Sequence, residues 1–216
     1  MTTPDDPRPD DIPEGEAHPD HASSDDAPPD DELRPWELVR TEPLADLRIA
    51  RARTDLLRHP RTGKVLDRTV LEVPAWVNVV ARTTPCETWP EGRLVVVRQY
   101  RFGTSAMSVE VPGGVVDPGE DHGEAARREL REETGHTAER WTYLGSVEPN
   151  PAFLTNRCHH WLAEGCARTH DLDLDEGEDI AVEFVPWPDV AARVHDGTLC
   201  HSLVVSALAR VVDLRG

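Results

Sequence analysis

The chain has 216 residues, a length that suits one domain of ordinary size together with tails. Acidic residues outnumber basic ones by 41 to 23, and the net charge of −18 leaves no basic stripe for binding nucleic acid. No apolar run approaches the roughly 18 residues that a membrane-spanning helix needs. The composition therefore predicts neither a nucleic-acid-binding protein nor a membrane protein.

The first 33 residues hold twelve of the acidic residues, a single base (Arg8) and very few apolar side chains. A segment this rich in Pro and Asp, with so little to bury, is predicted to be disordered. It also lacks the apolar stretch of a secretory signal. The four cysteines of the chain are scattered without a C-x-x-C pair, which disfavours a disulfide framework or a zinc ribbon. Reduced thiols in a cytoplasmic protein are the expectation.

The ordered part is predicted to begin near "RPWELVR", with dense strand signals from Leu47 onward. Strands are predicted over residues 47–57, 65–73, 75–82, 93–100, 107–112, 140–149, 158–165 and 180–187. Helices are predicted between Asp121 and Gly135, briefly after Trp187, and over residues 202–214. Runs of strands interrupted by a central helix, with further helix at the end, predict an α+β fold or a sheet sandwiched by helices.

The central helix has recognisable ends and a narrow apolar seam. Asp121 can cap its start, and Gly135 can supply its C-terminal stop. At 100° per residue, Ala126 and Leu130 form a seam that is expected to pack against the rest of the domain.

Three carboxylates, those of Glu129, Glu132 and Glu133, share a face of this helix beside the seam. Like-charge neighbours at these spacings weaken an isolated helix, although Arg128 can pair with Glu132. Hard divalent cations favour several converging carboxylate oxygens, so the crowding indicates a metal site. The alternative is a solvated acidic helix face.

The stretch "GVVDPGEDHGEAARRELREETGH" fits the pattern G-x5-E-x7-R-E-U-x-E-E-x-G-U, where U is a bulky apolar residue. It starts at Gly114 and departs from the pattern only at His136, which is expected to pack the helix end. The match resembles the signature of Nudix hydrolases, which cleave a diphosphate linked to another moiety. "VRQYRFG" and "SVEVPGG" also look like the Q-Y-R and E-L-P-A-G runs of the ADP-ribose pyrophosphatase group within that superfamily.

The resemblance implies a Nudix α/β/α sandwich with a mixed sheet, preceded by an N-terminal antiparallel strand region, and a cofactor that is Mg²⁺, with Mn²⁺ possible. The implied metal-site residues are Gly113, through its carbonyl, and Glu129, Glu132 and Glu133, with Arg128 steadying Glu132. The implied structural residues of the signature are Gly114, Glu120 and Gly135.

The same resemblance assigns the substrate side of the site. Arg101, from the Q-Y-R run, is expected to contact substrate; the alternative is an arginine that simply ends a strand. Independently of the resemblance, Glu110 is a candidate to anchor Arg101 by an ion pair, and its alternative is likewise a residue that only ends a strand. The acidic loop "DLDLDEGED" is expected to supply the catalytic base, with Glu178 as first candidate and Glu176 as second.

The chain is thus divided into a disordered tail over 1–33, a strand region for dimerisation over 34–73, and a Nudix hydrolase domain over 74–216. The expected activity is Mg²⁺-dependent hydrolysis of a nucleoside diphosphate sugar, with ADP-ribose cut to AMP and ribose 5-phosphate, by a homodimer. The alternatives are another nucleotide sugar such as GDP-mannose, or a Nudix module that senses ADP-ribose without turnover. Because such sensors usually lose the signature glutamates, and all are present here, catalysis is favoured.

Overall fold

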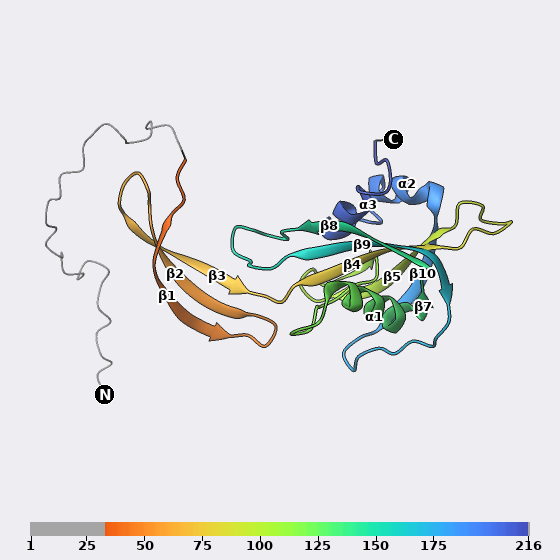
Figure 1. Cartoon of the computed structure of the whole chain (residues 1–216), viewed down its shortest axis with the longest axis horizontal. Helices are drawn as coiled ribbons and strands as arrows, with labels where there is room; N and C mark the ends of the chain where they lie inside the picture. Colours follow the sequence, from red (N-terminus) through yellow and green to blue (C-terminus); the bar gives the residue numbers. More distant parts are fainter. Residues whose placement is uncertain (1–32, 216) are drawn as a thin grey trace, which may run out of the picture. The chain divides into compact units, whose positions relative to one another are not determined.

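The computed structural model of the protein describes residues 33–215, so the predicted disordered tail lies outside the described residues except for Leu33. A three-stranded antiparallel sheet comes first, in the order β1 (Glu37–Asp46), β2 (Arg51–Arg58) and β3 (Val65–Glu72) (Figure 1). The prediction that strand structure starts at Leu47 is wrong. Residues 47–50 form the β1–β2 turn, in which the Leu47 amide donates to the carbonyl of Ala50.

A second, seven-stranded sheet forms the larger part of the molecule. Its main path runs β10 (Ile180–Pro186), β5 (Arg93–Arg101), β4 (Trp76–Thr83), β9 (Cys158–Arg168) and β7 (His136–Thr137). Two more strands, β6 (Ala106–Glu110) and β8 (Arg140–Val147), pair with β5 and β9. The β4–β9 pair is parallel and the other pairs are antiparallel, so the sheet is mixed as expected.

Helices cover both faces of this sheet. The helix α1 (His122–Thr134) packs Ala125, Ala126 and Leu130 against one face. The short helices η1 (Trp187–Asp189), α2 (Val190–His195) and α3 (Ser202–Leu208) lie on the other. Alternation along β4 sends Val79 to the α1 side and Val80 to the α2–α3 side, both fully buried. The result is the predicted α/β/α sandwich.

The last helix is shorter than predicted, because α3 ends at Leu208 rather than at residue 214. After it, the amides of Arg210 and Val211 donate to carbonyls three residues back, which tightens the chain into a turn. The Arg210 guanidinium donates to the carbonyls of Leu144 and Ser146 on β8, and this tertiary contact holds the turn in place.

Across residues 33–215, no helix combines the length and apolar character that crossing a bilayer requires. The helix α1 has only 13 residues and is strongly polar on its outer face.

Candidate active site

The helix α1 is fixed at both ends by the residues that the sequence indicates. The Asp121 carboxylate accepts hydrogen bonds from the amides of Gly123 at 2.8 Å and Glu124 at 3.3 Å, which satisfies two free N–H groups of the first turn. At the other end, Gly135 adopts a left-handed φ of 71° and its amide donates to the Arg131 carbonyl. Only a glycine takes this conformation without strain, so the helix stops there.

The two glycines before the helix lie too close to their neighbours to carry a side chain. A Cβ atom at Gly113 would overlap the carbonyl oxygen of Val77 on β4, and one at Gly114 would overlap the Glu129 carboxylate. The amide of Val77 donates to the Gly114 carbonyl at 2.9 Å, which holds this loop along β4. The Gly113 amide in turn donates to Oε2 of Glu133 at 2.9 Å.

Gly113→Ala is expected to destabilise the protein by about 1–3 kcal/mol, because the clash is with backbone atoms that cannot move aside easily. Gly103→Ala is the matched control, since a Cβ there meets no atom within 4 Å and the change should stay within about 0.5 kcal/mol. Urea unfolding of both variants measures the difference. Equal midpoints would show that the loop is free to move away from β4.

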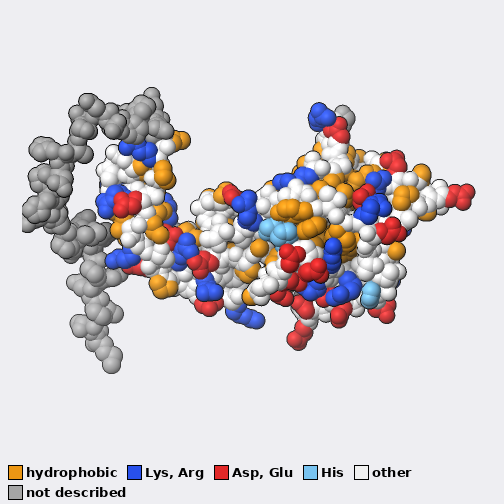
Figure 2. Space-filling model, in the orientation of Figure 1, with side chains coloured by type: hydrophobic (Ala, Val, Ile, Leu, Met, Phe, Trp, Pro, Cys, Tyr) orange, Lys and Arg blue, Asp and Glu red, His pale blue; other side chains and the backbone are white. Residues whose placement is uncertain are grey.

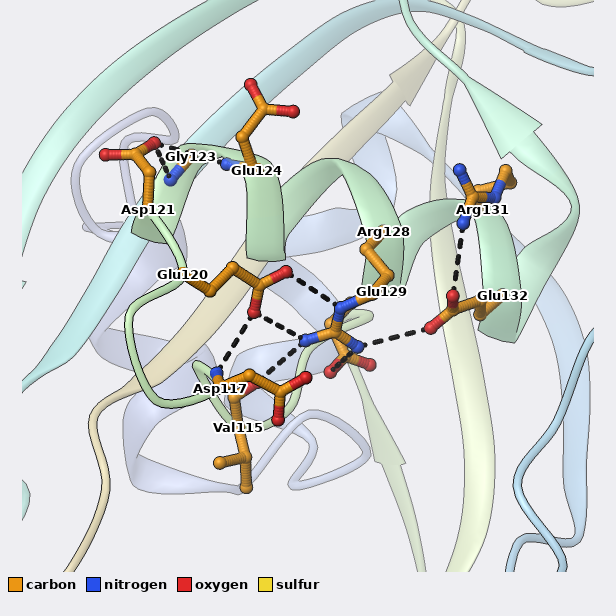
Figure 3. Close-up of polar contacts among 10 residues, drawn as sticks. All are labelled: Val115, Asp117, Glu120, Asp121, Gly123, Glu124, Arg128, Glu129, Arg131 and Glu132. Atoms are coloured by element: carbon orange, nitrogen blue, oxygen red, sulfur yellow. Dashed lines mark hydrogen bonds and ion pairs between the residues drawn. The ribbon is translucent and has the colours of Figure 1, made fainter.

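Arg128 is the centre of a charged network that joins the helix to the loop before it (Figure 3). Its guanidinium donates to both carboxylate oxygens of Glu120, at 2.9 and 3.0 Å, and to the Val115 carbonyl at 2.9 Å. Its Nη1 also donates to Glu129 at 2.9 Å and to Glu132 at 3.2 Å. The Glu120 carboxylate accepts a further bond from the Asp117 amide, so it ties loop and helix together.

These contacts change the ionisation of the groups that make them. Hydrogen bonds from Arg128 lower the pKa of Glu120, while the pKa of Arg128 is raised chiefly by Glu120. Both groups stay charged at neutral pH. Glu132 is held by Arg128 and also by Arg131 at 3.1 Å, and its backbone carbonyl accepts from the Asp173 amide. The predicted Arg128–Glu132 pair is therefore present, within a larger network.

The other two signature glutamates are buried. The Glu129 side chain is 11% exposed, and burial raises its pKa to about 7 despite the attraction of Arg128. Glu133 is 3% exposed, and burial raises its pKa well above the usual range even though the Gly113 amide stabilises its ionised form. In both carboxylates burial disfavours the ionised form, and an additional positive charge nearby would favour it.

The donor set of this helix face suits a hard divalent cation, because every candidate ligand is a carboxylate or carbonyl oxygen. A bound cation would add to the positive charge of Arg128 at Glu129 and would place a positive charge beside Glu133. Among residues 33–215, no three Asp, Glu, His or Cys side chains are already close enough together to hold a metal ion. Arg128 draws Glu129 and Glu132 toward itself, which accounts for the incomplete convergence on Glu133.

The substrate-side residues lie on the neighbouring strands β5 and β6. Arg101 donates to Glu110 through two parallel hydrogen bonds of 2.8 and 2.7 Å, the planar geometry that fixes a guanidinium best. Burial alone would raise the pKa of Glu110, but the bonds from Arg101 and Ser108 outweigh it and lower the pKa. Glu110 is buried whereas Arg101 is 44% exposed, so one face of the guanidinium remains available.

The two candidate bases differ in their electrostatic effect on the site. The charge of Glu178 acts on Arg101, Glu129 and Glu133. The Asp175 amide donates to its Oε2 at 3.2 Å. Glu176 is exposed on the same loop. Its charge is not among the main causes of the pKa shifts of Arg101, Glu129 and Glu133.

An aromatic cluster at the start of α1 was not anticipated. The His122 ring stacks on His159 with centroids 4.1 Å apart, and Trp161 donates to Nδ1 of His122 at 3.2 Å. The Tyr143 hydroxyl lies 2.9 Å from Nδ1 of His159. The cluster secures the helix start to β8 and β9. Strand alternation predicts that His159 points away from the buried His160, but not that it meets His122.

Acidic side chains are numerous on the part of the surface around α1, with arginines among them (Figure 2). This mixture, the buried carboxylates and the fixed arginine have the charges that would suit an anion accompanied by a cation.

The sequence and the fold agree on the family. The family model described as the NUDIX domain matches residues 86–202. The chain is 32% identical over 147 residues to the methanol dehydrogenase activator of Bacillus methanolicus, covering 67% of this chain and 76% of that protein. It is 34% identical over 133 residues to the ADP-ribose pyrophosphatase of Bacillus subtilis (strain 168), covering 61% and 69%.

A crystal structure of an ADP compounds hydrolase superposes on the chain with a TM-score of 0.71 at 23% identity, covering 83% of this chain and 94% of that one. This likeness shows the fold. Together these matches place the chain in the Nudix family, whose hydrolases generally use divalent metal ions. Within the family it is a pyrophosphohydrolase that resembles the ADP-ribose pyrophosphatases.

Proposed function

We propose that the protein hydrolyses the diphosphate bond of a nucleoside diphosphate sugar with Mg²⁺, and that ADP-ribose is cut to AMP and ribose 5-phosphate. The observation that carries the proposal is that groups suited to a cation and a group suited to an anion lie in one site. Glu129 and Glu133 are buried carboxylates that favour a nearby cation, and the guanidinium of Arg101 beside them, fixed by Glu110 and 44% exposed, can still pair with an anion. A diphosphate with its metal ion provides both. The 34% identity to an ADP-ribose pyrophosphatase supports the substrate.

Glu129, Glu132, Glu133 and the carbonyl of Gly113 would hold Mg²⁺, or Mn²⁺ in its place. When bound, the ion neutralises the diphosphate and lowers the pKa of bound water. Arg101 contacts a phosphate oxygen and fixes the orientation of the diphosphate, because Glu110 prevents the guanidinium from turning. Glu178, on the exposed loop, accepts the proton of the attacking water. Arg128 acts through Glu129 and Glu132 and is a positioning residue.

A substrate panel tests the proposal directly. Release of phosphate monoesters is measured with Mg²⁺ for ADP-ribose, GDP-mannose, NADH, a dinucleoside polyphosphate and 8-oxo-dGTP. ADP-ribose should give the highest kcat/KM. A higher value for GDP-mannose would keep the nucleotide-sugar class and reject ADP-ribose, and turnover of none would reject the proposed activity.

Addition of Mg²⁺ is expected to raise Tm, and to raise it more at pH 8 than at pH 6. The pKa of Glu129 rises from its ordinary value of 4.5 to about 7, so the metal-free fold loses stability as pH increases through that window. Above pH 7 the loss is on the order of 3 kcal/mol, and a cation bound to the ionised carboxylates offsets it. Thermal unfolding at both pH values, with and without Mg²⁺, measures the effect. An equal Mg²⁺ response at the two values would contradict the carboxylate site.

We further propose that the protein is a homodimer formed through the β1–β3 sheet. Several large apolar side chains of this region are exposed in the single chain, notably Leu38, Leu44 and Ile49 at 55%, 61% and 82%. Large apolar side chains left exposed on one small sheet suggest a surface that a second copy of the chain covers. Light scattering after gel filtration should give twice the chain mass, and Leu44→Glu should shift it toward the monomer. A monomeric wild-type protein would reject the proposal.

A further inference from the structure

A cavity of about 550 Å³ lies away from the carboxylates, where β4 ends, β5 begins and α1 terminates. We call it the Arg93 cavity, and its walls include Cys86, Trp89, Arg93, His136, Arg168 and Phe184. Arg93 begins β5 and Arg101 ends it, so the cavity is roughly 26 Å along the strand from the substrate-side arginine. This volume is ordinary for a small-molecule site.

The charge of the cavity is opposite to that of the chain. None of the described residues that line it is Asp or Glu, although the protein carries a net charge of −18. Two arginines, Arg93 and Arg168, contribute positive charge to the walls. Arg168 forms an ion pair with Asp171, 3.5 Å away and fully exposed, which neutralises it weakly. An acidic protein thus retains a basic cavity.

Arg93 is held in place by aromatic rings, but its hydrogen bonding is incomplete. Its guanidinium carbon lies 4.2 Å from the centre of the Phe184 ring and 5.7 Å from that of Trp89. Its buried Nε has no hydrogen-bond partner among the described residues. A buried donor without a partner is unfavourable, so the hydrogen bonding of Arg93 is incomplete, while the rest of its half-buried side chain can still meet a ligand.

The remaining walls offer a polar group and flat apolar surfaces. The buried His136 has Nδ1 2.9 Å from the Thr134 carbonyl, so Nδ1 donates there and Nε2 is left to accept. Burial, together with Arg168 and Arg93, lowers the pKa of His136 and keeps the ring neutral. Trp89 and Leu172 add apolar surface on which a planar ring packs.

We propose that the Arg93 cavity is a second binding site, for a small phosphate monoester that carries a planar ring. The phosphate pairs with the guanidinium groups of Arg93 and Arg168, and the ring packs against Trp89 and Leu172. The site is separate from the carboxylates of α1, because none of Glu129, Glu132 and Glu133 lines it.

The position of the site connects it to the loop over residues 169–179, which carries Glu178. The amides of Thr169 and His170 donate to the Gly135 carbonyl, and the Asp173 amide donates to the Glu132 carbonyl. Leu172, between these anchors, lines the cavity. A bound ligand therefore restrains the loop at its root and should change turnover. This last consequence rests on the proposed function, whereas the binding site does not.

Protection of Cys86 from alkylation tests the site in the full-length protein. Cys86 is an exposed thiol in the cavity wall, and Cys200 is an exposed thiol outside it. Phenyl phosphate is the probe, and phenol is the uncharged control. Phenyl phosphate should slow iodoacetamide labelling of Cys86 several-fold while leaving Cys200 unchanged, as measured by peptide mass spectrometry, and phenol should protect neither.

Arg93→Gln and Arg168→Gln should each raise the phenyl phosphate concentration for half-protection by about tenfold or more, because each removes a charge-assisted hydrogen bond. Arg168 is 61% exposed, so its variant keeps the fold even if the Arg93 variant does not. Arg127→Gln is the matched control, since Arg127 also lies over a tryptophan ring, Trp141, but outside the cavity. Absence of protection, equal protection by phenol, or full protection in Arg168→Gln would overturn the proposal.

Discussion

Glu133→Gln is expected to lower kcat by on the order of 10³-fold or more, because a metal ligand that stabilises the transition state contributes several kcal/mol. The same substitution should leave the fold intact and raise Tm at pH 8 in the absence of metal. Burial raises the pKa of Glu133 well above the usual range, so ionising this side chain in the folded protein lowers the free energy of unfolding. A glutamine at this position is uncharged and avoids that loss. Glutamine has nearly the same shape and still accepts the hydrogen bond from Gly113.

Glu124→Gln provides the control on the same helix. Glu124 is exposed in the first turn and forms a long ion pair with Arg127, at 3.7 Å. Kinetics and thermal unfolding of this variant should match the wild type. Full activity in Glu133→Gln would remove Glu133 from the metal site, and a lower Tm would show that its burial stabilises the fold.

Arg128→Gln is expected to lower stability by about 2–4 kcal/mol and Tm by roughly 5–10 °C. Arg128 is the shared partner of Glu120, Glu129 and Glu132, so its loss leaves three carboxylates close together without the cation that separates them. The glutamine side chain cannot replace five donated hydrogen bonds. Mg²⁺ should restore part of the loss, because Glu129 and Glu132 are then free to bind it.

Arg131→Gln is the appropriate comparison, since Arg131 also contacts Glu132, at 3.1 Å. Its side chain is 44% exposed, so the loss of this ion pair should cost less than about 1 kcal/mol. Equal losses in the two variants, measured by thermal unfolding, would mean that Arg128 acts as an ordinary surface arginine.

Local sequence chemistry predicted the central helix well. Both ends of α1 depend on contacts within a few residues, the Asp121 cap and the left-handed Gly135, so the sequence alone suffices to place them. The buried seam of Ala126 and Leu130 follows from helical periodicity in the same way. Strands with dense runs of apolar, β-branched residues, such as β4 and β5, were also predicted to within a residue or two of their ends.

The parts that were missed depend on distant contacts. Every residue of β1 is exposed, so its sequence carries no alternation, and it is a strand because β2 pairs with it. The contact between Arg128 and Glu120 spans eight residues and a loop whose path no local rule supplies. The end of α3 is likewise set by the bonds of Arg210 to β8. The Arg93 cavity arises only when β4, β5, β9 and β10 are assembled.

The loop over residues 169–179 has a consequence for how such an enzyme diversifies. Its root is joined to the helix end by backbone bonds to Gly135 and Glu132, which any sequence can make. Beyond that root its side chains are largely exposed. Insertions and deletions there would alter the approach of a substrate while leaving the signature helix and its glycine contacts untouched. We expect new substrate preferences to be gained most readily by remodelling this loop, and libraries that vary its length are the place to select for them.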